Sequence, residues 1–408
     1  MKKNDCLMKA LRYLLLAAGV LVLTCAVSAQ SPQTLRKLKN KYRYVGRSHD
    51  GLMVVSSNDA PGPRIGGFVV GMRFGYADTL GKDVIPVQFD YASDFSQGLA
   101  LVGIGKCDVR KFGFIDLSGQ AAIPIEYDNA ELTKEGLLKV MRKEGIAEQW
   151  GYLSRDGEVA VPLEYGQLMK PAEGFIAAAK GTWTEGKTAM SSPKFKGKYG
   201  FLDYEGNVLI PFDFVDAHSF QNGVAAVAVE GKYYPKWGFI DTFGKTVVPF
   251  RYYEVRNFRE GLALVGRVID GEVRYGFIGP DGEEVIAAQY ASAREFRDGY
   301  ALVSEFSKSD FAPFYLIDRA GNRRLPYALY DVNDSGRYGH MTAAVPDSTG
   351  LLRYGLIDKR GRQIIPFQYD RITIFSEWDA QTQSWKEAGI AEVNGMERSF
   401  NIFRNSKK

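Results

Sequence analysis

The residue types that most often carry chemistry are scattered through this 408-residue sequence. Asp213 and Asp216 form the kind of carboxylate pair that a hydrolase could use as acid and base, but their spacing on a strand or turn has no privileged geometry. Beyond residue 29 the chain holds one cysteine and three widely separated histidines, which do not make a ligand set for zinc: Cys107, His49, His218 and His340. We therefore expect no catalytic residue, no metal site and no cofactor.

A repeat organises the rest of the chain. In seven copies a glycine follows an aromatic residue, and Tyr315 takes its place in an eighth copy: Gly75, Gly113, Gly151, Gly200, Gly238, Gly276 and Gly355. The steps between copies are 38, 38, 49, 38, 38, 39 and 40 residues. A second glycine lies six residues on in every copy, and a proline lies eleven on in all but one, where Ala287 stands. A fixed period of this kind indicates a tandem repeat architecture.

Each copy is predicted to form three short strands, here called a, b and c. Strand a covers residues 112–116 in the second copy, and the Asp-x-x-Gly of Asp116 to Gly119 predicts a tight turn after it. Strand b covers residues 121–127 and carries Pro124, so it must be an edge strand or leave the ladder there. Strand c covers residues 99–102 in the first copy and leads through a turn into the next strand a.

The predicted fold is therefore all-β, a tandem array of about eight three-stranded antiparallel units. Each unit needs its neighbours to cover its apolar surface. Two arrangements remain open, an open curved β-solenoid and a closed propeller-like ring. Three strands per unit favour the solenoid, because propeller blades typically have four. The array starts with an unaccompanied strand c at 51–55 and ends with an unaccompanied strand a at 398–403, and this favours the ring.

The repeat resembles the WG-repeat family of bacterial proteins. The resemblance is carried by Trp150-Gly151-Tyr152, by Trp237-Gly238-Phe239-Ile240-Asp241, and by the Val-Pro or Ile-Pro that is followed by Tyr three residues later. It covers roughly residues 45–403, with copies starting near 74, 112, 150, 199, 237, 275, 314 and 354. The resemblance implies a secreted or envelope-associated repeat protein and brings no catalytic residues.

Residues 1–29 have the features of a secretory signal peptide. A basic start containing Lys2 and Lys3 precedes an apolar run from Leu14 to Val27, and small residues before Gln30 suit cleavage. The apolar run is shorter than the ~20 residues that a membrane-spanning helix needs. An alternative is a lipoprotein anchored through Cys25, although Leu23-Thr24-Cys25 is a poor lipobox. We expect export to the periplasm or outer surface of a Gram-negative bacterium, with no transmembrane span after cleavage.

The remaining segments follow from composition. Residues 30–44 are polar and basic and are predicted to be a mobile lead-in, with room for one helical turn, and residues 404–408 are a short tail. Insertions at 57–70, 181–197 and 376–387 break the period and are predicted to be loops. Binding residues tend to lie in loops on a rigid scaffold. The insertions hold three of the five tryptophans, our candidate binding residues: Trp183, Trp378 and Trp385.

These observations favour a non-catalytic binding or scaffold protein of the bacterial envelope, with an envelope protein or a glycan as its partner. An alternative is a carbohydrate or peptidoglycan recognition module, since Phe, Trp and Tyr make up 13% of the chain and sugars stack on such rings. A hydrolytic enzyme is a third interpretation. Nucleic acid is not an expected partner, because the formal charge is only +4 and no basic stripe is present.

Overall fold

The protein is built from β-strands. The structure, a computed structural model, describes residues 38–56, 64–65, 68–69, 72–106, 109–186, 192–307, 312–333, 340–379, 384–393 and 395–401. Apart from one helical turn at 38–41, the regular elements within these ranges are strands, which confirms the all-β prediction. None of the helical structure in these ranges has the length and apolar character that crossing a bilayer requires.

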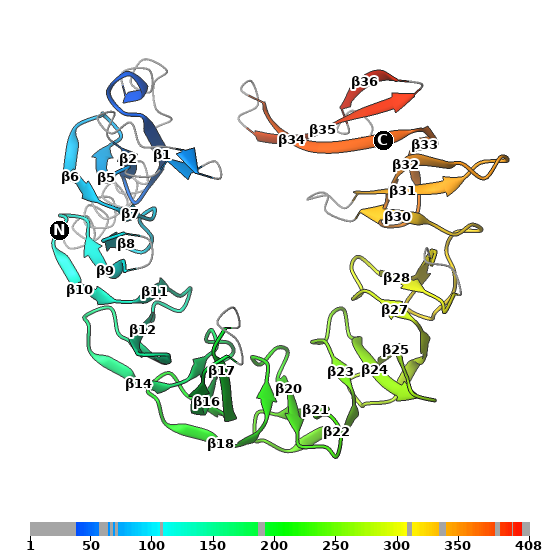
Figure 1. The fold of residues 1–408 in the computed structure, drawn as a ribbon, viewed down its shortest axis with the longest axis horizontal. Coiled ribbons are helices and arrows are strands. Elements are labelled where there is room, and N and C mark those ends of the chain that lie inside the picture. The colour runs from blue at the N-terminus through cyan, green and yellow to red at the C-terminus, as the bar shows by residue number, and fades with distance from the viewer. Residues whose placement is uncertain are drawn as a thin grey trace, which may run out of the picture. The chain divides into compact units, whose positions relative to one another are not determined.

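The strands form small antiparallel sheets that follow one another along the chain (Figure 1). The chain divides into two compact units, which are described separately below: unit 1 comprises 1–167 and 182–195, and unit 2 comprises 168–181 and 196–408. The division passes through the hairpin of β16 (Ile176–Thr184) and β17 (Lys194–Leu202), which with β15 (Gln167–Leu168) and β18 (Val208–Phe214) makes one four-stranded sheet.

Unit 1 holds three complete repeat sheets. Their strands, in sheet order, are β1 (Tyr44–His49), β2 (Leu52–Ser56), β5 (Phe74–Asp78) and β6 (Asp83–Phe89); β10 (Ala121–Tyr127), β9 (Lys111–Asp116), β8 (Leu99–Ile104) and β7 (Tyr91–Ala92); and β11 (Asn129–Leu132), β12 (Leu138–Glu144), β13 (Ala147–Leu153) and β14 (Val159–Tyr165). A small hairpin of β3 (Arg64–Ile65) and β4 (Phe68–Val69) falls within the first insertion.

Unit 2 continues the pattern. Its sheets are β19 (Asp216–Ala217), β20 (Val224–Val229), β21 (Lys236–Asp241) and β22 (Thr246–Tyr252); β23 (Glu254–Val255), β24 (Ala263–Ile269), β25 (Glu272–Ile278) and β26 (Glu284–Tyr290); β27 (Ser292–Ala293), β28 (Tyr300–Ser304) and β29 (Phe314–Asp318); β30 (Tyr330–Asn333), β31 (His340–Pro346), β32 (Leu352–Asp358) and β33 (Gln363–Tyr369); and β34 (Arg371–Asp379), β35 (Ser384–Val393) and β36 (Met396–Asn401).

Strands a, b and c form as predicted in most copies, and most sheets also contain a fourth strand. In the order β19-β20-β21-β22, β20 is strand c, β21 is strand a, β22 is strand b, and β19 is a two-residue strand that was not predicted. Two residues are too few to show the alternation by which a strand is recognised. The fourth strand removes the reason for preferring the open solenoid, because four is the usual number in a propeller blade. The choice between solenoid and ring stays a prediction.

The sheets also explain why the array begins and ends in the middle of a repeat. A sheet combines strand c of one copy with strands a and b of the next, so β2 pairs directly with β5 and β36 pairs with β35. The first strand c and the last strand a are therefore paired within sheets, although the last sheet ends at β36 without a strand b in the described residues. These ends therefore do not by themselves favour a closed ring over an open array, and the choice stays a prediction.

The apolar cores lie between successive sheets. On β9, Phe114 packs in the core toward the β11–β14 sheet, whereas the next residue, Ile115, packs in the core with Tyr76 of the preceding sheet. Strand a is thus buried on both faces, since successive side chains point to opposite sides. One aromatic contact recurs between sheets, with ring centroids 4.7–4.9 Å apart: Tyr76–Phe95, Phe201–Phe220, Phe239–Phe258 and Phe277–Phe296.

The glycine of strand a is required by a close approach within the sheet. A Cβ on Gly238 would lie 2.5 Å from the carbonyl oxygen of Val248 on β22. The register moves from Trp237↔Tyr252 to Phe239↔Val248, so β22 bulges away from β21 at this point. Pro249 lies in that bulge, and β22 is the edge strand of its sheet. Both predicted positions for the proline, on an edge strand and at a break in the ladder, are therefore confirmed.

The copy that lacks this glycine shows the consequence. Tyr315 occupies its position on β29, and there the sheet order stops at β29, with no strand b among the described residues. The opposite segment forms only the isolated bridges Ile317↔Arg323 and Phe314↔Leu329. The Arg323 guanidinium lies 3.7 Å from the centre of the Tyr315 ring. A tyrosine at this position is thus incompatible with the close approach of strand b that the glycine permits in the other copies.

The Asp-x-x-Gly turns form as predicted. Oδ1 of Asp116 accepts hydrogen bonds from the backbone N–H groups of Ser118 (2.9 Å) and Gln120 (3.0 Å), and Gly119 has φ +87°. A Cβ added to Gly119 would lie 3.1 Å from Ile85, on strand b of the preceding sheet. The glycine therefore serves both the left-handed turn and the contact between sheets.

The segments at the two ends differ in part from expectation. Within the predicted lead-in, the helical turn at 38–41 is present, but it is packed rather than mobile, because Leu38 and Tyr42 are buried against the first sheet. The predicted signal peptide at 1–29, Cys25, Cys107 and the tail at 404–408 lie outside the described residues.

We expect Gly238→Val to lower the free energy of unfolding by about 1–3 kcal/mol, because its side chain would overlap the backbone of β22. Thermal or urea denaturation measures the difference. Thr246→Val on β22, an exposed position, serves as the control and should leave stability unchanged. Equal stability of the wild type and Gly238→Val would contradict the steric role of the glycine.

Candidate anion-binding site

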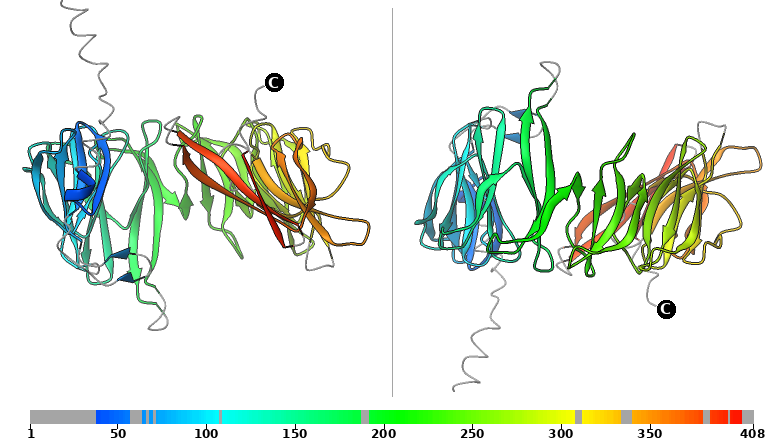
Figure 2. Two further views of the ribbon diagram at one scale, coloured as in Figure 1. Left: turned by 90° about the horizontal axis from the view of Figure 1, so that it is seen from above. Right: turned by 90° about the horizontal axis from the view of Figure 1, so that it is seen from below.

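The structure places the three candidate tryptophans on strands and not in loops. Trp183 lies on β16, and Trp378 and Trp385 lie opposite each other on β34 and β35. The two insertions that hold them, at 181–197 and 376–387, lengthen both strands of a hairpin, so they extend the sheet; the β16–β17 hairpin is the long green one in Figure 2. The side chains of Trp378 and Trp385 lie outside what the structure describes.

The Trp183 indole is half-buried in unit 1. Its Nε1 donates a hydrogen bond to the backbone oxygen of Glu148 at 3.3 Å, and its ring centre is 5.4 Å from that of Phe195. The ring therefore packs against the protein and is not a freely exposed platform. Its role in binding stays a prediction.

The other chemically capable residues do not gather into a site. Asp213 lies on β18 and Asp216 on β19, which belong to different sheets. Burial raises the pKa of Asp216, and its Oδ1 accepts a hydrogen bond from the backbone of Ala217. Nδ1 of His218 lies 3.4 Å from Oδ1 of Asn257. In the described ranges no three His, Cys, Asp or Glu side chains are grouped as metal ligands would be.

A repeated backbone path marks the edge of each sheet that begins with a two-residue strand. After that strand the chain runs beside strand c and turns back through two left-handed residues, the second of which is the third repeat glycine. In the β23–β26 sheet these are Glu260 (φ 53°) and Gly261 (φ 82°). The same backbone hydrogen bonds recur from sheet to sheet, for example Arg256 N–H to Leu264 and Arg294 N–H to Leu302, both at 2.8 Å. Because backbone hydrogen bonds maintain this path, the residue types at its exposed positions can differ from copy to copy.

Two positions on this path carry arginine only in successive sheets of unit 2. The residue after the short strand is Ser93, Met169, His218, Arg256 and Arg294 in turn along the chain, and the residue before the left-handed pair is Ser96, Ala172, Gln221, Arg259 and Arg297. We call the four residues Arg256, Arg259, Arg294 and Arg297 the arginine edge. Alignment of these loops between copies could have revealed it from the sequence, but the prediction of function relied on the positions that stay constant.

The arginine edge is only partly neutralised. Arg256 pairs with Glu254 at 2.8 Å, and Arg259 pairs with Glu295 at 3.1 Å. Arg294 and Arg297 are exposed, and neither forms a salt bridge with a carboxylate in the described ranges. The Arg294 guanidinium lies over Phe314, 5.5 Å from the ring centre. A surface that holds two such guanidinium groups on one turn of the chain favours an anionic ligand.

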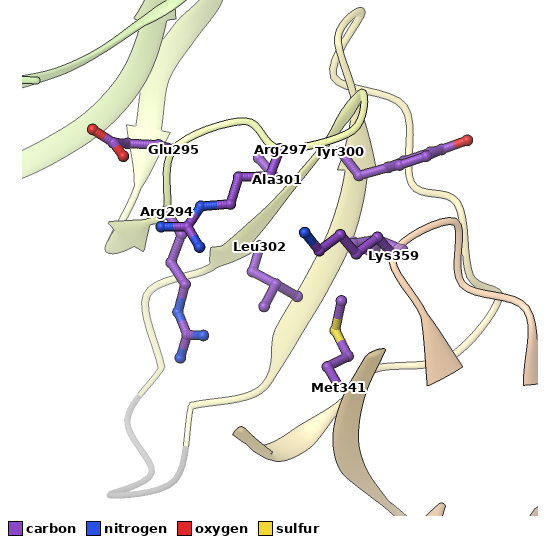
Figure 3. Close-up of a pocket in the computed structure, with 9 residues that line it drawn as sticks. Arg294, Glu295, Arg297, Tyr300, Ala301, Leu302, Met341 and Lys359 are labelled. Carbon is purple, nitrogen blue, oxygen red and sulfur yellow. The ribbon is translucent and has the colours of Figure 1, made fainter. Parts of the chain in front are cut away.

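Three hollows meet at Arg297. One of about 320 Å³ is lined by Arg256, Leu264, Ala293, Arg294, Glu295 and Arg297. One of about 490 Å³ has polar walls that include Gln221, Asn222, Arg259, Glu260, Arg297 and Asp298. A narrow crevice of about 20 Å³ lies between Arg297, Lys359 and the apolar Leu302 and Met341. Figure 3 shows Arg294 and Arg297 on one side of Leu302 and Lys359 extending toward it from the other.

Acidic residues fix the turns at this edge. The two carboxylate oxygens of Glu260 accept hydrogen bonds from the backbone N–H groups of Asp298 (2.5 Å) and Gly299 (2.8 Å) in the next sheet. Partial burial opposes ionisation of Glu260, but the Arg319 guanidinium and these N–H groups hold its pKa below the usual value. Lys359, 2.9 Å from Asp298, likewise lowers the pKa of that carboxyl.

Taken together, the fold and the repeats define a tandem β-repeat protein. The sequence profile of the family described as "WG containing repeat" matches seven segments, which together make up more than half of the chain: 74–106, 112–145, 150–181, 199–233, 237–266, 275–305 and 354–377. The chain belongs to this family, as the resemblance predicted. The copy with Tyr315, in which no strand b is described, is not among the matched segments.

Solved structures align with this chain at low sequence identity. A structure titled as the eukaryotic initiation factor aligns with a TM-score of 0.43 and 11% identity, over 88% of this chain and 90% of its own. Porphyromonas gingivalis dipeptidyl peptidase 4 aligns with a TM-score of 0.40 and 9% identity, over 85% and 64%. Pyrococcus horikoshii acylaminoacyl peptidase aligns with a TM-score of 0.32 and 12% identity, over 74% and 58%. No curated protein matches the chain.

We expect Glu260→Gln to lower the free energy of unfolding by about 1–2 kcal/mol at neutral pH, because an amide replaces one of the two acceptors that hold the next turn. The folded-state pKa of Glu260 is lowered, so its contribution is present above the unfolded-state pKa and is lost as the pH falls through the folded value. The stability difference between variant and wild type should therefore vanish in acid.

Urea denaturation across a pH series measures this difference, with Glu283→Gln in the exposed β25–β26 turn as the control. A difference that stayed constant down to the most acidic pH would show that the charge of Glu260 is not responsible.

Proposed function

We propose that this protein is a non-catalytic binding protein of the bacterial envelope, and that the arginine edge of unit 2 holds an anionic ligand. The observation that carries the proposal is the restriction of arginine to two equivalent positions in two successive sheets, where the backbone path is the same as in other sheets. A residue needed only for folding would be expected in most copies. A pair of positions that varies on a constant framework is typical of a binding surface.

The geometry supports binding in three ways. The backbone around the arginines is held by repeated hydrogen bonds and by the Glu260 contact with the next turn, so little ordering is needed on binding. The two larger hollows fall in the size range of ligand pockets, roughly 300–1,000 Å³. Within the described ranges, Arg294 and Arg297 can bind an anion without first breaking a salt bridge.

A second candidate function, carbohydrate or peptidoglycan recognition, is favoured by the larger hollow. Its walls combine amide side chains from Gln221 and Asn222 with the carboxylates of Glu260 and Asp298. Such a mixture of donors and acceptors suits hydroxyl groups. The remaining interpretation, a hydrolytic enzyme, has no observation in its favour.

Binding of anionic probes tests the proposal. We would titrate the purified protein with labelled oligogalacturonate, oligoglutamate and oligophosphate at several salt concentrations. At least one probe should bind, and the double variant Arg294→Gln/Arg297→Gln should weaken it by about tenfold or more, since charge-assisted hydrogen bonds contribute roughly 1.5–3 kcal/mol each. The variant should stay folded with a melting temperature close to that of the wild type, because it loses only the exposed contact of Arg294 with Phe314 and neither arginine forms a salt bridge in the part of the chain that the structure describes.

The matched control is Lys232→Gln/Lys245→Gln, which removes two exposed cations from elsewhere in unit 2. Equal losses in both double variants would mean that only the overall charge matters, and the arginine edge would not be the site. Failure of every anionic probe to bind would contradict the proposed function as a whole.

Fractionation of the producing bacterium tests the envelope location. We expect the protein in the periplasm or on the cell surface, with an N-terminus near Gln30 after removal of the leader. Mass spectrometry of the isolated protein identifies that terminus. Recovery of the full-length chain in the cytosolic fraction would contradict export. A lipid attached to Cys25 would instead show that the exported protein is a lipoprotein anchored to a membrane.

A further inference from the structure

The two larger hollows at the arginine edge share one wall but differ in chemistry. Arg297 lines both of them. The smaller hollow is cationic, with the guanidinium groups of Arg256, Arg294 and Arg297 against the single carboxylate of Glu295, which is already bound to Arg259. A ligand that occupies both hollows must therefore present two different groups on either side of Arg297.

From these neighbouring hollows we infer that the ligand is an acidic oligosaccharide, an inference that rests on the proposed binding function. One sugar residue places its carboxylate in the smaller hollow, and the adjacent residue places its hydroxyl groups in the larger one. Guanidinium groups bind carboxylates in a forked geometry, which matches the smaller hollow. Leu264 and Ala293 supply apolar wall there for the C–H face of a ring.

The larger hollow suits hydroxyl groups rather than a second anion. The exposed Gln221 and Asn222 each offer a donor and an acceptor. The carboxylate of Asp298, with 65% of its side chain exposed, lines the same hollow and offers acceptors beside the ammonium of Lys359. A sugar hydroxyl both donates and accepts, so it can use each of these groups. A second anion finds two of the three cations of this hollow already paired, Arg259 with Glu295 and Lys359 with Asp298.

Two other common polyanions, single-stranded nucleic acid and acidic peptides, can be compared with the residues that line these hollows. Single-stranded nucleic acid is usually held by stacking of its bases on exposed aromatic rings. The aromatic residues of the larger hollow, Phe258 and Phe296, are 5% and 1% exposed and are occupied in contacts with Phe239 and Phe277 of the preceding sheets. An acidic peptide would satisfy the arginines, and its backbone would also satisfy the amides of Gln221 and Asn222, so it is the competing ligand that the experiment has to separate from a saccharide.

Calorimetry with three matched probes tests the inference: tetragalacturonate, its fully methyl-esterified and therefore neutral form, and tetraglutamate. We expect tetragalacturonate to bind about tenfold or more tightly than either of the others. Arg294→Gln/Arg297→Gln should weaken tetragalacturonate and tetraglutamate alike. Gln221→Ala/Asn222→Gly should weaken only tetragalacturonate, and the glycine preserves the left-handed backbone of residue 222, whose φ is 56°.

The outcomes separate the two proposals. If tetraglutamate binds as tightly as tetragalacturonate, or if Gln221→Ala/Asn222→Gly has no effect on the saccharide, the saccharide inference is overturned and an anion-binding function stands. If the neutral ester binds as well as the acid, both the inference and the role of the arginine edge are overturned. If no anionic probe binds at all, the proposed function fails with it. Melting temperatures of both variants check that each remains folded.

Discussion

The inner repeat sheets of this protein have two apolar faces, and a sheet of three or four short strands cannot cover either one by itself. The alternation of Phe114 and Ile115 on one strand shows the solution, since the first residue packs toward the following sheet and the second toward the preceding one. Burial of strand a therefore depends on the presence of both neighbours. The repeated aromatic pairs, such as Phe277 with Phe296, set the contact between one sheet and the next.

This dependence explains which positions are constant and which are free to vary. The glycine of strand a cannot be replaced without a clash, because the backbone of the bulged strand b lies against it. The turn glycine is required both by its left-handed backbone angle and by a side chain of the preceding sheet that packs against it, such as Ile85 against Gly119. The two arginine positions on the path beside the two-residue strand meet no such requirement, because backbone hydrogen bonds, the buried aromatic residue between them and the carboxylate of Glu260 maintain that path. The arginine edge lies on this permissive path, where a ligand can be accommodated without disturbing the cores.

Much of the fold is predictable from residue types at fixed offsets. Asp116 and Gly119 identify a tight turn, and Pro124 identifies an edge strand, because each has a local physical reason for its position. The two-residue strands are not predictable, since pairing of so few residues is set by the neighbouring strand c. The lengthened hairpins around Trp183 and Trp385 resemble loops in the sequence, because an insertion in a repeat does not reveal whether its two halves pair. The arginine edge escapes prediction because the constant positions, which define the repeat, exclude the residues that differ between copies.

The bulged, proline-bearing strand b has a consequence for how the protein behaves at high concentration. It is the outer strand of its sheet, with one side left unpaired, and in most proteins such an edge invites hydrogen bonding with another chain. Pro249 has no N–H to offer, and the irregular register at Phe239↔Val248 prevents a second strand from aligning along the whole edge. The bulge that fits strand b around the glycine thus also protects the sheets that carry it, together with its proline, against intermolecular β-aggregation.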